Sequence, residues 1–389
     1  MEKIKLDDLC VPSARQIKED PDKLIDYIDI ASVDNENKKV TGFQTMSFGE
    51  APSRARKAVK KGSILVSTVR PNLNAVAILE DDTPNVSVAS TGFCILNCKD
   101  NVDNRFVFNF CKSKAFIEDM VSQATGASYP AVSDNIVRSA LVPNYPYEEQ
   151  CHISEILDRV SSAIEKRKVE LAILDDLIKA RFVEMFGDPV INPKGLPMVA
   201  LGELSELITK GASPSWQGFS YTDDSSQTIF VTSENVREGY IDLSFPKYIE
   251  DGFNEKQKRS VIHKGDFLIN IVGASIGRAA QFNLDCKANM NQAAALVRVN
   301  DSRVRDKYLL TYLNSDRAQR MYDSMKSDTG RANLSLQDIS DLLILLPNVE
   351  QQIEFETFAN QVDKSKVAVQ KALTETQLLF DSLMQQYFG

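Results

Sequence analysis

The amino-acid sequence predicts an α+β protein in which two mixed-sheet domains are separated by two long helices. The whole chain is expected to form an internal repeat with pseudo-two-fold symmetry. Three observations carry this prediction. The second half of the 389-residue chain repeats the first half, each copy ends in a long heptad pattern, and each copy begins with a stretch that mixes β-branched segments and helical ones.

The repeat is visible in matched segments. The sequence KGSILV at 61–66 recurs as KGDFLI at 264–269, and a run with Gly, Asp and Pro at equal spacing occupies 126–143 and again 330–347. Each copy then passes through an acidic, glutamine-containing segment into a helical pattern that ends in Phe-Gly. Self-similarity over most of the chain indicates one architecture built twice.

The predicted helices carry apolar residues in alternating steps of three and four, the heptad spacing of a helix packed along a seam. Each copy has one such apolar seam, and no other predicted element is long enough to cover it, so we predict that the two helices pair. An antiparallel coiled coil is expected because a duplicated unit closes through a pseudo-two-fold axis. In the first copy the seam comprises Ile153, Leu157, Val160, Ile164, Arg167, Leu171, Leu174, Ile178, Arg181 and Met185.

These patterns divide the chain into a first domain at 1–147, a first helix at 148–187, a second domain at 188–347 and a second helix at 348–389. A helix stop is expected at Gly187, where Asp-Pro follows. Within the domains, strands are predicted at Val59–Leu79, Val88–Asn97, Phe267–Val272 and Ala293–Val299, and helices at Asp103–Gln123 and Arg305–Lys326.

The composition is that of an ordinary globular protein, with 43% hydrophobic and 25% charged residues. The longest aliphatic run, Leu342–Leu346, is far too short to span a bilayer, and the N-terminus has no apolar signal core, so we expect a cytoplasmic protein without a membrane partner. The six cysteines form no paired motif, and a zinc site is not predicted. Cys151 and His152 are interpreted as ordinary helix residues, because neighbours in a helix point about 100° apart.

No catalytic or cofactor motif is legible in the sequence. The loop Gly273–Arg278 follows a predicted strand but lacks the Gly-Lys-Ser/Thr ending of a phosphate-binding loop, and we interpret it as a turn. No dinucleotide-binding glycine motif follows a strand. We therefore expect no enzyme activity and no cofactor bound by this chain.

DNA binding is compatible with some features of the sequence and opposed by one. The net charge of −9 is unfavourable, because duplex binding draws on phosphate neutralisation by Lys and Arg. Runs of basic residues without an acid occur at 54–61 and 256–264, and these fit either a solvated face or a DNA contact. Arg, Asn and Gln, which can read base edges, recur at matching places in the two copies, although turns and strand ends also favour polar residues.

The whole chain resembles the specificity subunits of type I restriction–modification systems, in which recognition domains alternate with long helices. The resemblance is carried by short motifs in a fixed order within the duplicated frame. In the first half these are Tyr27–Ser32, Ala51–Arg56, Ser67–Pro71 and Ala89–Phe93, and in the second half Lys210–Trp216, Phe230–Asn235, Lys264–Leu268, Gly273–Gly277 and Asn291-Gln292.

The resemblance implies that each domain is a target recognition domain that reads one half of a bipartite site in double-stranded DNA. The paired helices would set the gap between the half-sites and dock two modification subunits. Those subunits would carry S-adenosylmethionine and methylate adenine at N6, and restriction (motor-nuclease) subunits would cut with ATP and Mg²⁺. The DNA-binding residues we select on this basis are Arg54, Arg56, Arg70, Asn72, Trp216, Ser275, Arg278, Asn291, Gln292 and Arg331.

Rival classes make distinct demands on the sequence. An independent DNA methyltransferase would need an Asn/Asp-Pro-Pro-aromatic motif, which neither Asp188-Pro189-Val190 nor Asn192-Pro193-Lys194 provides. A nuclease would need clustered carboxylates and a lysine on one strand edge. The alternative that stays open is a coiled-coil scaffold or interaction protein without base-specific DNA readout. The target letters and the gap length do not follow from the sequence.

Overall fold

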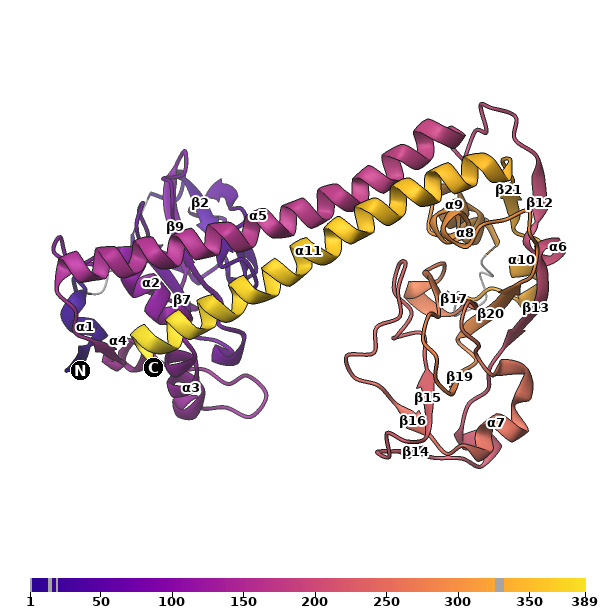
Figure 1. The fold of residues 1–389 in the computed structure, drawn as a ribbon. Coiled ribbons are helices and arrows are strands. Elements are labelled where there is room, and N and C mark those ends of the chain that lie inside the picture. Colours follow the sequence, from indigo (N-terminus) through magenta and orange to yellow (C-terminus); the bar gives the residue numbers. More distant parts are fainter. Residues whose placement is uncertain (1, 13–15, 19, 326–331) are drawn as a thin grey trace. The chain divides into compact units, whose positions relative to one another are not determined.

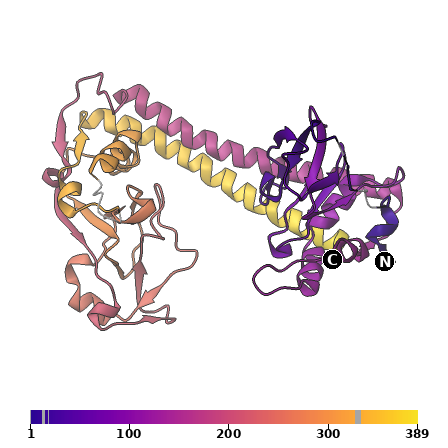
Figure 2. The ribbon, with the colours of Figure 1, turned by 180° about the vertical axis from the view of Figure 1, so that it is seen from behind.

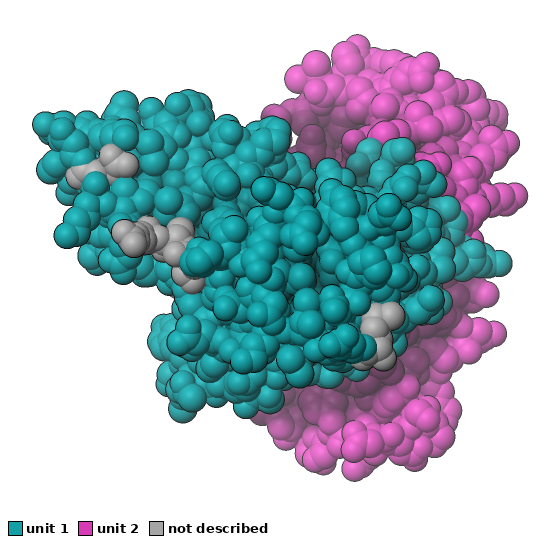
Figure 3. All heavy atoms as spheres, turned by 90° about the vertical axis from the view of Figure 1, so that its left-hand side faces the viewer, with its two compact units in different colours: residues 1–169, 370–389 teal, residues 170–369 magenta. Residues whose placement is uncertain are grey.

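The computed structural model describes residues 2–12, 16–18, 20–325 and 332–389. The chain forms two compact units, coloured separately in Figure 3. Unit 1 comprises Met1–Val169 and Gln370–Gly389, and unit 2 comprises Glu170–Val369. Each unit contains one mixed α/β domain and a part of each of the two long helices, α5 (Tyr147–Phe186) and α11 (Val349–Phe388). The predicted fold class is therefore confirmed.

Unit 1 is built on two main sheets. In the first sheet β2 pairs in parallel with β9 and antiparallel with β5, so this sheet is mixed, as predicted. Its order is β5 (Gln44–Ser47), β2 (Leu24–Ile28), β9 (Val86–Ser90) and β6 (Ala55–Ala58). The second sheet is antiparallel, in the order β10 (Phe93–Leu96), β7 (Ile64–Ser67) and β8 (Val76–Ile78), and two small ribbons pair β1 (Lys3–Lys5) with β11 (Leu141–Pro143) and β3 (Val33–Asp34) with β4 (Lys39–Val40).

The helices of unit 1 cover this second sheet and enclose a core that also includes the ends of the long helices. The helix predicted at Asp103–Gln123 is two helices. Ser113 ends the first one, and its hydroxyl accepts a hydrogen bond from the Phe116 backbone N–H, which starts the second. The helices are α1 (Leu6–Leu9), α2 (Asn104–Lys112), α3 (Lys114–Gln123) and α4 (Asp134–Ser139).

Unit 2 repeats this plan with two four-stranded sheets and one ribbon. One sheet is antiparallel, in the order β13 (Ser205–Lys210), β20 (Ala294–Val299), β17 (Phe267–Asn270) and β18 (Ala279–Gln281). The other contains the parallel pair β15–β19. Its order is β14 (Tyr221–Thr222), β16 (Tyr248–Ile249), β15 (Thr228–Val231) and β19 (Ala288–Met290), while β12 (Met198–Ala200) pairs with β21 (Leu343–Leu345).

The helix predicted at Arg305–Lys326 also divides, at Asn314. The Asn314 amide donates to the carbonyls of Ala279 and Leu310, and its oxygen accepts from the Ala279 N–H, which ties the end of the helix to the edge strand β18. Lys326 lies outside the described residues. The helices of unit 2 are α6 (Leu201–Leu204), α7 (Gly252–Lys256), α8 (Asp306–Leu313), α9 (Asp316–Met325) and α10 (Leu336–Ser340).

Two predicted strands are wrong in their extent. The segment Val59–Leu79 contains β7 and β8, separated by a turn of 3-10 helix at Pro71–Leu73. Proline lacks the N–H that a strand ladder needs, and the flanking Arg70 and Asn74 have left-handed backbones. The segment Val88–Asn97 contains β9 and β10, which belong to different sheets because the chain turns between them.

The long helices lie side by side and antiparallel within each unit (Figures 1 and 2). In unit 1 Arg167 of α5 donates to the Thr376 hydroxyl of α11, and in unit 2 Lys366 of α11 forms an ion pair with Asp175 of α5. The predicted pairing is thereby confirmed. Of the predicted seam residues, Ile153, Leu157, Ile164 and Ile178 are buried.

The internal repeat extends to individual contacts. Phe388, near the end of α11, packs on Phe106 of α2 with ring centroids 5.2 Å apart, and Phe186, near the end of α5, packs on Tyr308 of α8 at 4.9 Å. Helix α5 ends at Phe186, where the predicted stop Gly187 has a φ of 81°. In each unit the last aromatic residue of a long helix therefore packs on the equivalent aromatic residue of a domain helix, which is α2 in unit 1 and α8 in unit 2.

Candidate nucleic-acid interface

In unit 1 three loops join at one end of the β10–β7–β8 sheet. The Thr68 N–H donates to the Gly92 carbonyl at 2.9 Å, and the Val132 N–H donates to the Thr68 carbonyl at 2.9 Å. The Arg70 N–H donates to the Pro130 carbonyl at 2.7 Å. The turn after β7, the turn between β9 and β10 and the loop before α4 therefore form one hydrogen-bonded loop cluster, which we call loop cluster 1 (residues 67–75, 90–93 and 125–132).

Unit 2 contains the equivalent arrangement, loop cluster 2 (residues 270–278, 291–293 and 332–334). The Ile271 N–H donates to the Ala293 carbonyl at 3.0 Å, and the Leu334 N–H donates to the Ile271 carbonyl at 2.9 Å. The Gly273 N–H donates to the Ala332 carbonyl at 3.1 Å. Motifs that are far apart in the sequence of each half are thus brought together on the same backbone frame.

The candidates of unit 1 lie on or beside loop cluster 1. The Arg54 carbonyl accepts from the Thr91 N–H at 2.7 Å, and the Arg54 side chain is 58% exposed, with a single 3.4 Å contact to Asp29. Arg70 and Asn72 are exposed on the turn after β7. The Arg70 guanidinium lies 4.9 Å from the ring centroid of Tyr129. These side chains are available to a ligand in solution.

Arg56 is a different case. Its guanidinium donates to the Ala55 carbonyl at 2.7 Å and lies 5.0 Å above the Phe48 ring, and the residue is only partly exposed. The nearby Lys57 is also engaged, since its ammonium contacts Asp134 at 2.5 Å and the Phe93 carbonyl at 2.7 Å. Part of the basic run at 54–61 therefore stabilises the domain.

In unit 2, Trp216, Arg278 and Gln292 are exposed, and Trp216 is the most prominent of them with 87% of its surface exposed. The loop that carries Trp216 approaches loop cluster 2 closely at Gly211. A Cβ on this glycine would lie 1.8 Å from the Met290 carbonyl oxygen, so only glycine fits there. Arg331 lies outside the described residues.

Ser275 and Asn291 have engaged side chains. The Ser275 hydroxyl accepts from the Asn270 amide at 3.1 Å, and the Asn291 amide oxygen accepts from the Ala293 N–H at 3.0 Å. Asn270 is fully buried and also donates to the Ser233 carbonyl at 2.9 Å. These residues stabilise the turns of loop cluster 2. From the sequence alone, this role could not be distinguished from contact with a base.

Two residues that contact the turn after β7 were not among the selected DNA-binding residues, although Ser128-Tyr129 is one of the polar positions that recur in the two copies. Tyr129, whose ring lies against Arg70, follows Arg70 by more than fifty positions, and no local pattern links the two. Lys38 donates from its ammonium to the Asn74 carbonyl at 2.6 Å, and partial burial lowers the pKa of Lys38. Such contacts depend on tertiary structure, so spacing arguments do not find them.

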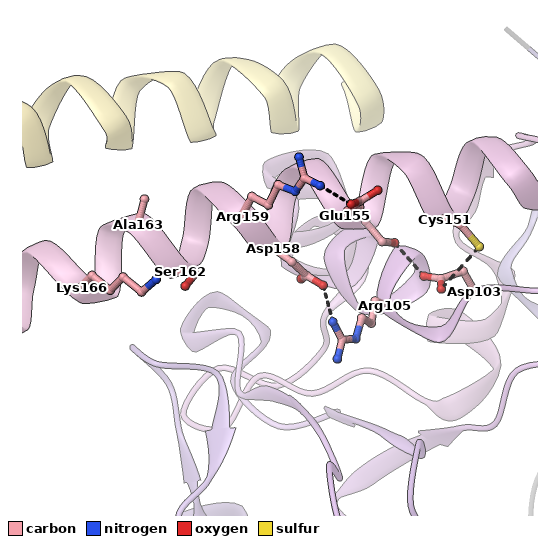
Figure 4. Close-up of a pocket in the computed structure, with 10 residues that line it drawn as sticks. Asp103, Arg105, Cys151, Glu155, Asp158, Arg159, Ser162, Ala163 and Lys166 are labelled. Carbon is pink, nitrogen blue, oxygen red and sulfur yellow. Dashed lines mark hydrogen bonds and ion pairs between the residues drawn. The ribbon is translucent and has the colours of Figure 1, made fainter.

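A pocket of about 640 Å³ lies along α5 in unit 1 (Figure 4). Four of its charged side chains form ion pairs, Arg105 with Asp158 at 2.5 Å and Arg159 with Glu155, and Asp103 accepts from the Ser154 hydroxyl at 2.7 Å. Cys151 lies 3.9 Å from Asp103 and has no histidine partner in these contacts. The contacts that line this pocket link the start of α2 to α5.

Within residues 2–12, 16–18, 20–325 and 332–389, no group of three His, Cys, Asp or Glu side chains is arranged to hold a metal ion. In the same part of the chain, no helix combines the length and the apolar character that crossing a membrane requires.

Two α+β domains with equivalent exposed loops, alternating with paired helices, define a duplicated recognition protein. The family model of the type I restriction modification DNA specificity domain matches residues 1–173 and 193–376, one copy in each half. The chain therefore belongs to the family of type I restriction–modification specificity proteins.

Curated relatives agree with this assignment. The chain is 22% identical over 321 residues to the EcoBI specificity subunit of Escherichia coli, a match that covers 75% of this chain and 66% of that protein. It is 28% identical to the HindI specificity subunit of Haemophilus influenzae over 39% of this chain and 34% of that protein. The matched region thus spans between one third and two thirds of these relatives.

Solved structures show the same fold. One of them comes from work on the structural basis of complex assembly and conformational transition of the type I restriction–modification system. It superposes with a TM-score of 0.64 and 24% identity, covering 100% of this chain and 97% of that one. The specificity subunit from M. genitalium superposes with a TM-score of 0.56 and 14% identity, covering 100% and 96%.

Proposed function

We propose that this chain is the sequence-specificity subunit of a type I restriction–modification enzyme, and that each unit reads one half of a bipartite double-stranded DNA target. One observation carries this proposal. The two units present equivalent loop clusters on the same hydrogen-bonded frame, but with different side chains, Arg70 and Asn72 in one and Arg278 in the other. An asymmetric bipartite target requires such an arrangement, in which one backbone frame presents different base-contacting side chains in each unit.

The exposure of the candidate side chains is the basis on which we divide them between the half-sites. Arg54, Arg70 and Asn72 contact the first half-site, and Trp216, Arg278 and Gln292 contact the second, because these side chains are exposed. The engaged side chains of Arg56, Ser275 and Asn291 shape the loops instead. Arg331 stays a candidate by its sequence position alone.

The helices are the docking surface for partners in this proposal. Ile173 and Leu177 lie one turn apart on α5 and are 59% and 43% exposed, and Val367 of α11 is 71% exposed. Exposed apolar side chains on successive turns of a helix are compatible with a protein-binding surface, and this supports the proposal. We propose that two modification subunits bind here and, with S-adenosylmethionine, methylate adenine at N6, and that restriction subunits add ATP- and Mg²⁺-dependent cleavage. The complex would act on DNA in the cytoplasm.

The test is to map methylated adenines in DNA exposed to the chain together with the modification subunits of its own system. We expect one bipartite motif with two different half-sites. The chain alone is expected neither to methylate nor to cut DNA. Methylation by the isolated chain with S-adenosylmethionine would contradict the non-catalytic role. Normal assembly with the modification subunits but no sequence preference would favour the coiled-coil scaffold instead.

A further inference from the structure

The turn that follows β7 holds two residues with side chains in the left-handed backbone region, Arg70 with a φ of 50° and Asn74 with a φ of 46°. For an L-residue this conformation crowds Cβ against the backbone, and asparagine tolerates it better than arginine does. Such a conformation persists only where the surrounding structure imposes it, and it is found preferentially at functional sites. Arg70 is thus the unusual residue of this turn.

The equivalent turn of unit 2 has the same two left-handed positions, and there both are glycine. Gly273 has a φ of 82° and Gly277 a φ of 89°. The equivalence rests on hydrogen bonds as well as on sequence register, because the Arg70 N–H and the Gly273 N–H donate to the matching carbonyls of Pro130 and Ala332. The backbone frame is therefore satisfied by glycine, and Arg70 occupies a position that favours glycine.

Contacts from distant parts of unit 1 fix the turn in this shape. The Asn74 amide donates to the Cys111 carbonyl at 2.9 Å, and the Asn74 carbonyl accepts from the Lys38 ammonium at 2.6 Å. Asn74 is only 8% exposed. The turn is consequently held by α2 on one side and by the segment between β3 and β4 on the other.

The Arg70 side chain leaves this fixed turn toward solvent and meets one restraint, the ring of Tyr129. The guanidinium lies 4.9 Å from the ring centroid, and Tyr129 itself is 68% exposed. The loop that carries Tyr129 is closed by a pair of hydrogen bonds between Thr125 and Ala131, at 3.0 and 2.9 Å. Tyr129 therefore stands on a hydrogen-bonded loop, and its exposed ring lies against the Arg70 guanidinium.

We infer that Arg70 is a specificity-determining residue for one guanine of the first half-site and that Tyr129 is its positioning residue. This inference rests on the proposed function. A guanidinium fork donates two parallel hydrogen bonds to guanine O6 and N7 in the major groove. Because the turn and the ring restrict the guanidinium before DNA arrives, less side-chain freedom is lost on binding.

The test uses the chain in complex with its modification subunits and duplexes with single base-pair replacements in the mapped target. Arg70→Gly should lower discrimination at one guanine of the first half-site by about 5- to 150-fold. Its melting temperature should stay within about 2 °C of the wild type, because relief of the left-handed strain offsets the added freedom of the unfolded chain. A purely structural arginine would instead show a lower melting temperature with unchanged discrimination.

Tyr129 is tested through its coupling to Arg70. Tyr129→Leu should lower discrimination at the same guanine by about 2- to 5-fold, and Tyr129→Phe, which keeps the ring, should leave it unchanged. In an Arg70→Gly background Tyr129→Leu should have no further effect, because Tyr129 acts through Arg70. Phe43→Leu, which removes another exposed aromatic ring of unit 1 outside loop cluster 1 and the long helices, is the matched control and should change nothing at either half-site.

The second half-site is the internal control. If Arg70→Gly leaves every letter of the target unchanged while methylation continues, Arg70 does not read a base and the inference is wrong, although the proposed function stands. Additive effects of Arg70→Gly and Tyr129→Leu would overturn the positioning role of Tyr129. If the wild-type complex shows no sequence preference at all, the proposed function fails, whatever the variants do.

Discussion

The aromatic joint at the end of α11 offers a quantitative test of how unit 1 is built. Phe388 is 1% exposed and packs against Phe106 at 5.2 Å and Phe110 at 6.1 Å. Replacement of a buried phenylalanine by alanine lowers the free energy of unfolding by about 3–5 kcal/mol, since it removes apolar contacts and leaves a cavity. For a unit of this size the melting temperature should fall by about 6–20 °C.

The equivalent joint of unit 2 provides the paired variant. Phe186 is also 1% exposed and packs on Tyr308 at 4.9 Å and Phe355 at 5.7 Å. Phe388→Ala should destabilise unit 1, and Phe186→Ala should destabilise unit 2. Hydrogen exchange separates these outcomes, because amides of α2 should lose protection in the first variant and amides of α8 in the second.

A surface residue of the same helix is the control. Leu379 is 51% exposed, so Leu379→Ala should shift the free energy of unfolding by no more than about 0.5 kcal/mol. If Phe388→Ala left the protection of α2 intact and reduced that of α8, the assignment of the end of α11 to unit 1 would be refuted.

Three further predictions follow from other parts of the chain. If Arg278 reads a base, Arg278→Ala should weaken DNA binding by about 1–3 kcal/mol and relax the preference at one position of the second half-site. If Arg278 contacts a phosphate, the variant should weaken binding to all duplexes alike and lower the slope of the salt dependence by about one. If affinity, specificity and salt slope are all unchanged, Arg278 is a surface turn residue. Insertion of four residues after Glu170, about 6 Å of helical rise, should change the gap of the methylated motif and leave its letters unaltered, and altered letters with an unaltered gap would contradict the spacer role of the helices. Burial lowers the pKa of Lys112 from 10.5 to about 8, so the folded state binds fewer protons than the unfolded state between these values, and the free energy of unfolding should rise with pH from about 8 to 10.5. The rise in the free energy of unfolding should stay below about 3 kcal/mol, because the Phe108 ring 4.3 Å from the Lys112 ammonium favours the charged form. Urea unfolding at pH values of about 8 and 10.5 should show this rise in the wild type and not in Lys112→Met.

Much of the architecture could be predicted because its determinants are periodic or local. The heptad pattern fixes one face of each long helix, and burial of Ile153, Leu157 and Ile178 follows from that face. Gly187 could be identified as a helix stop because glycine accepts the left-handed conformation found there. The duplication needs no structural knowledge, since it is a property of the sequence alone.

The errors arose where tertiary contacts decide the outcome. Ser113 and Asn314 are both compatible with a helix interior in a hydrophobic pattern, and they end helices here because of the partners that their side chains find. The selection of Arg56 and Asn291 as DNA-binding residues stays a prediction, and the structure adds that Nη1 of Arg56 and the amide oxygen of Asn291 are bonded within their own domains. The pairing of Arg70 with Tyr129 has no sequence signal, because it joins two loops that are far apart in the chain.

The composition of unit 1 has a consequence for the order in which the protein is made. Unit 1 includes Gln370–Gly389, and the ribosome synthesises these residues only after all of unit 2. Until then the nascent first domain lacks Met384 and Phe388, and the apolar surfaces of Phe106 and Phe110 that they cover remain open. Unit 2, which is continuous in sequence, can complete its core first, although the domain that precedes it was translated earlier. A chain interrupted between Val369 and Phe388 would therefore carry a finished second domain and an unfinished first one, a form that chaperones and proteases recognise by its exposed core.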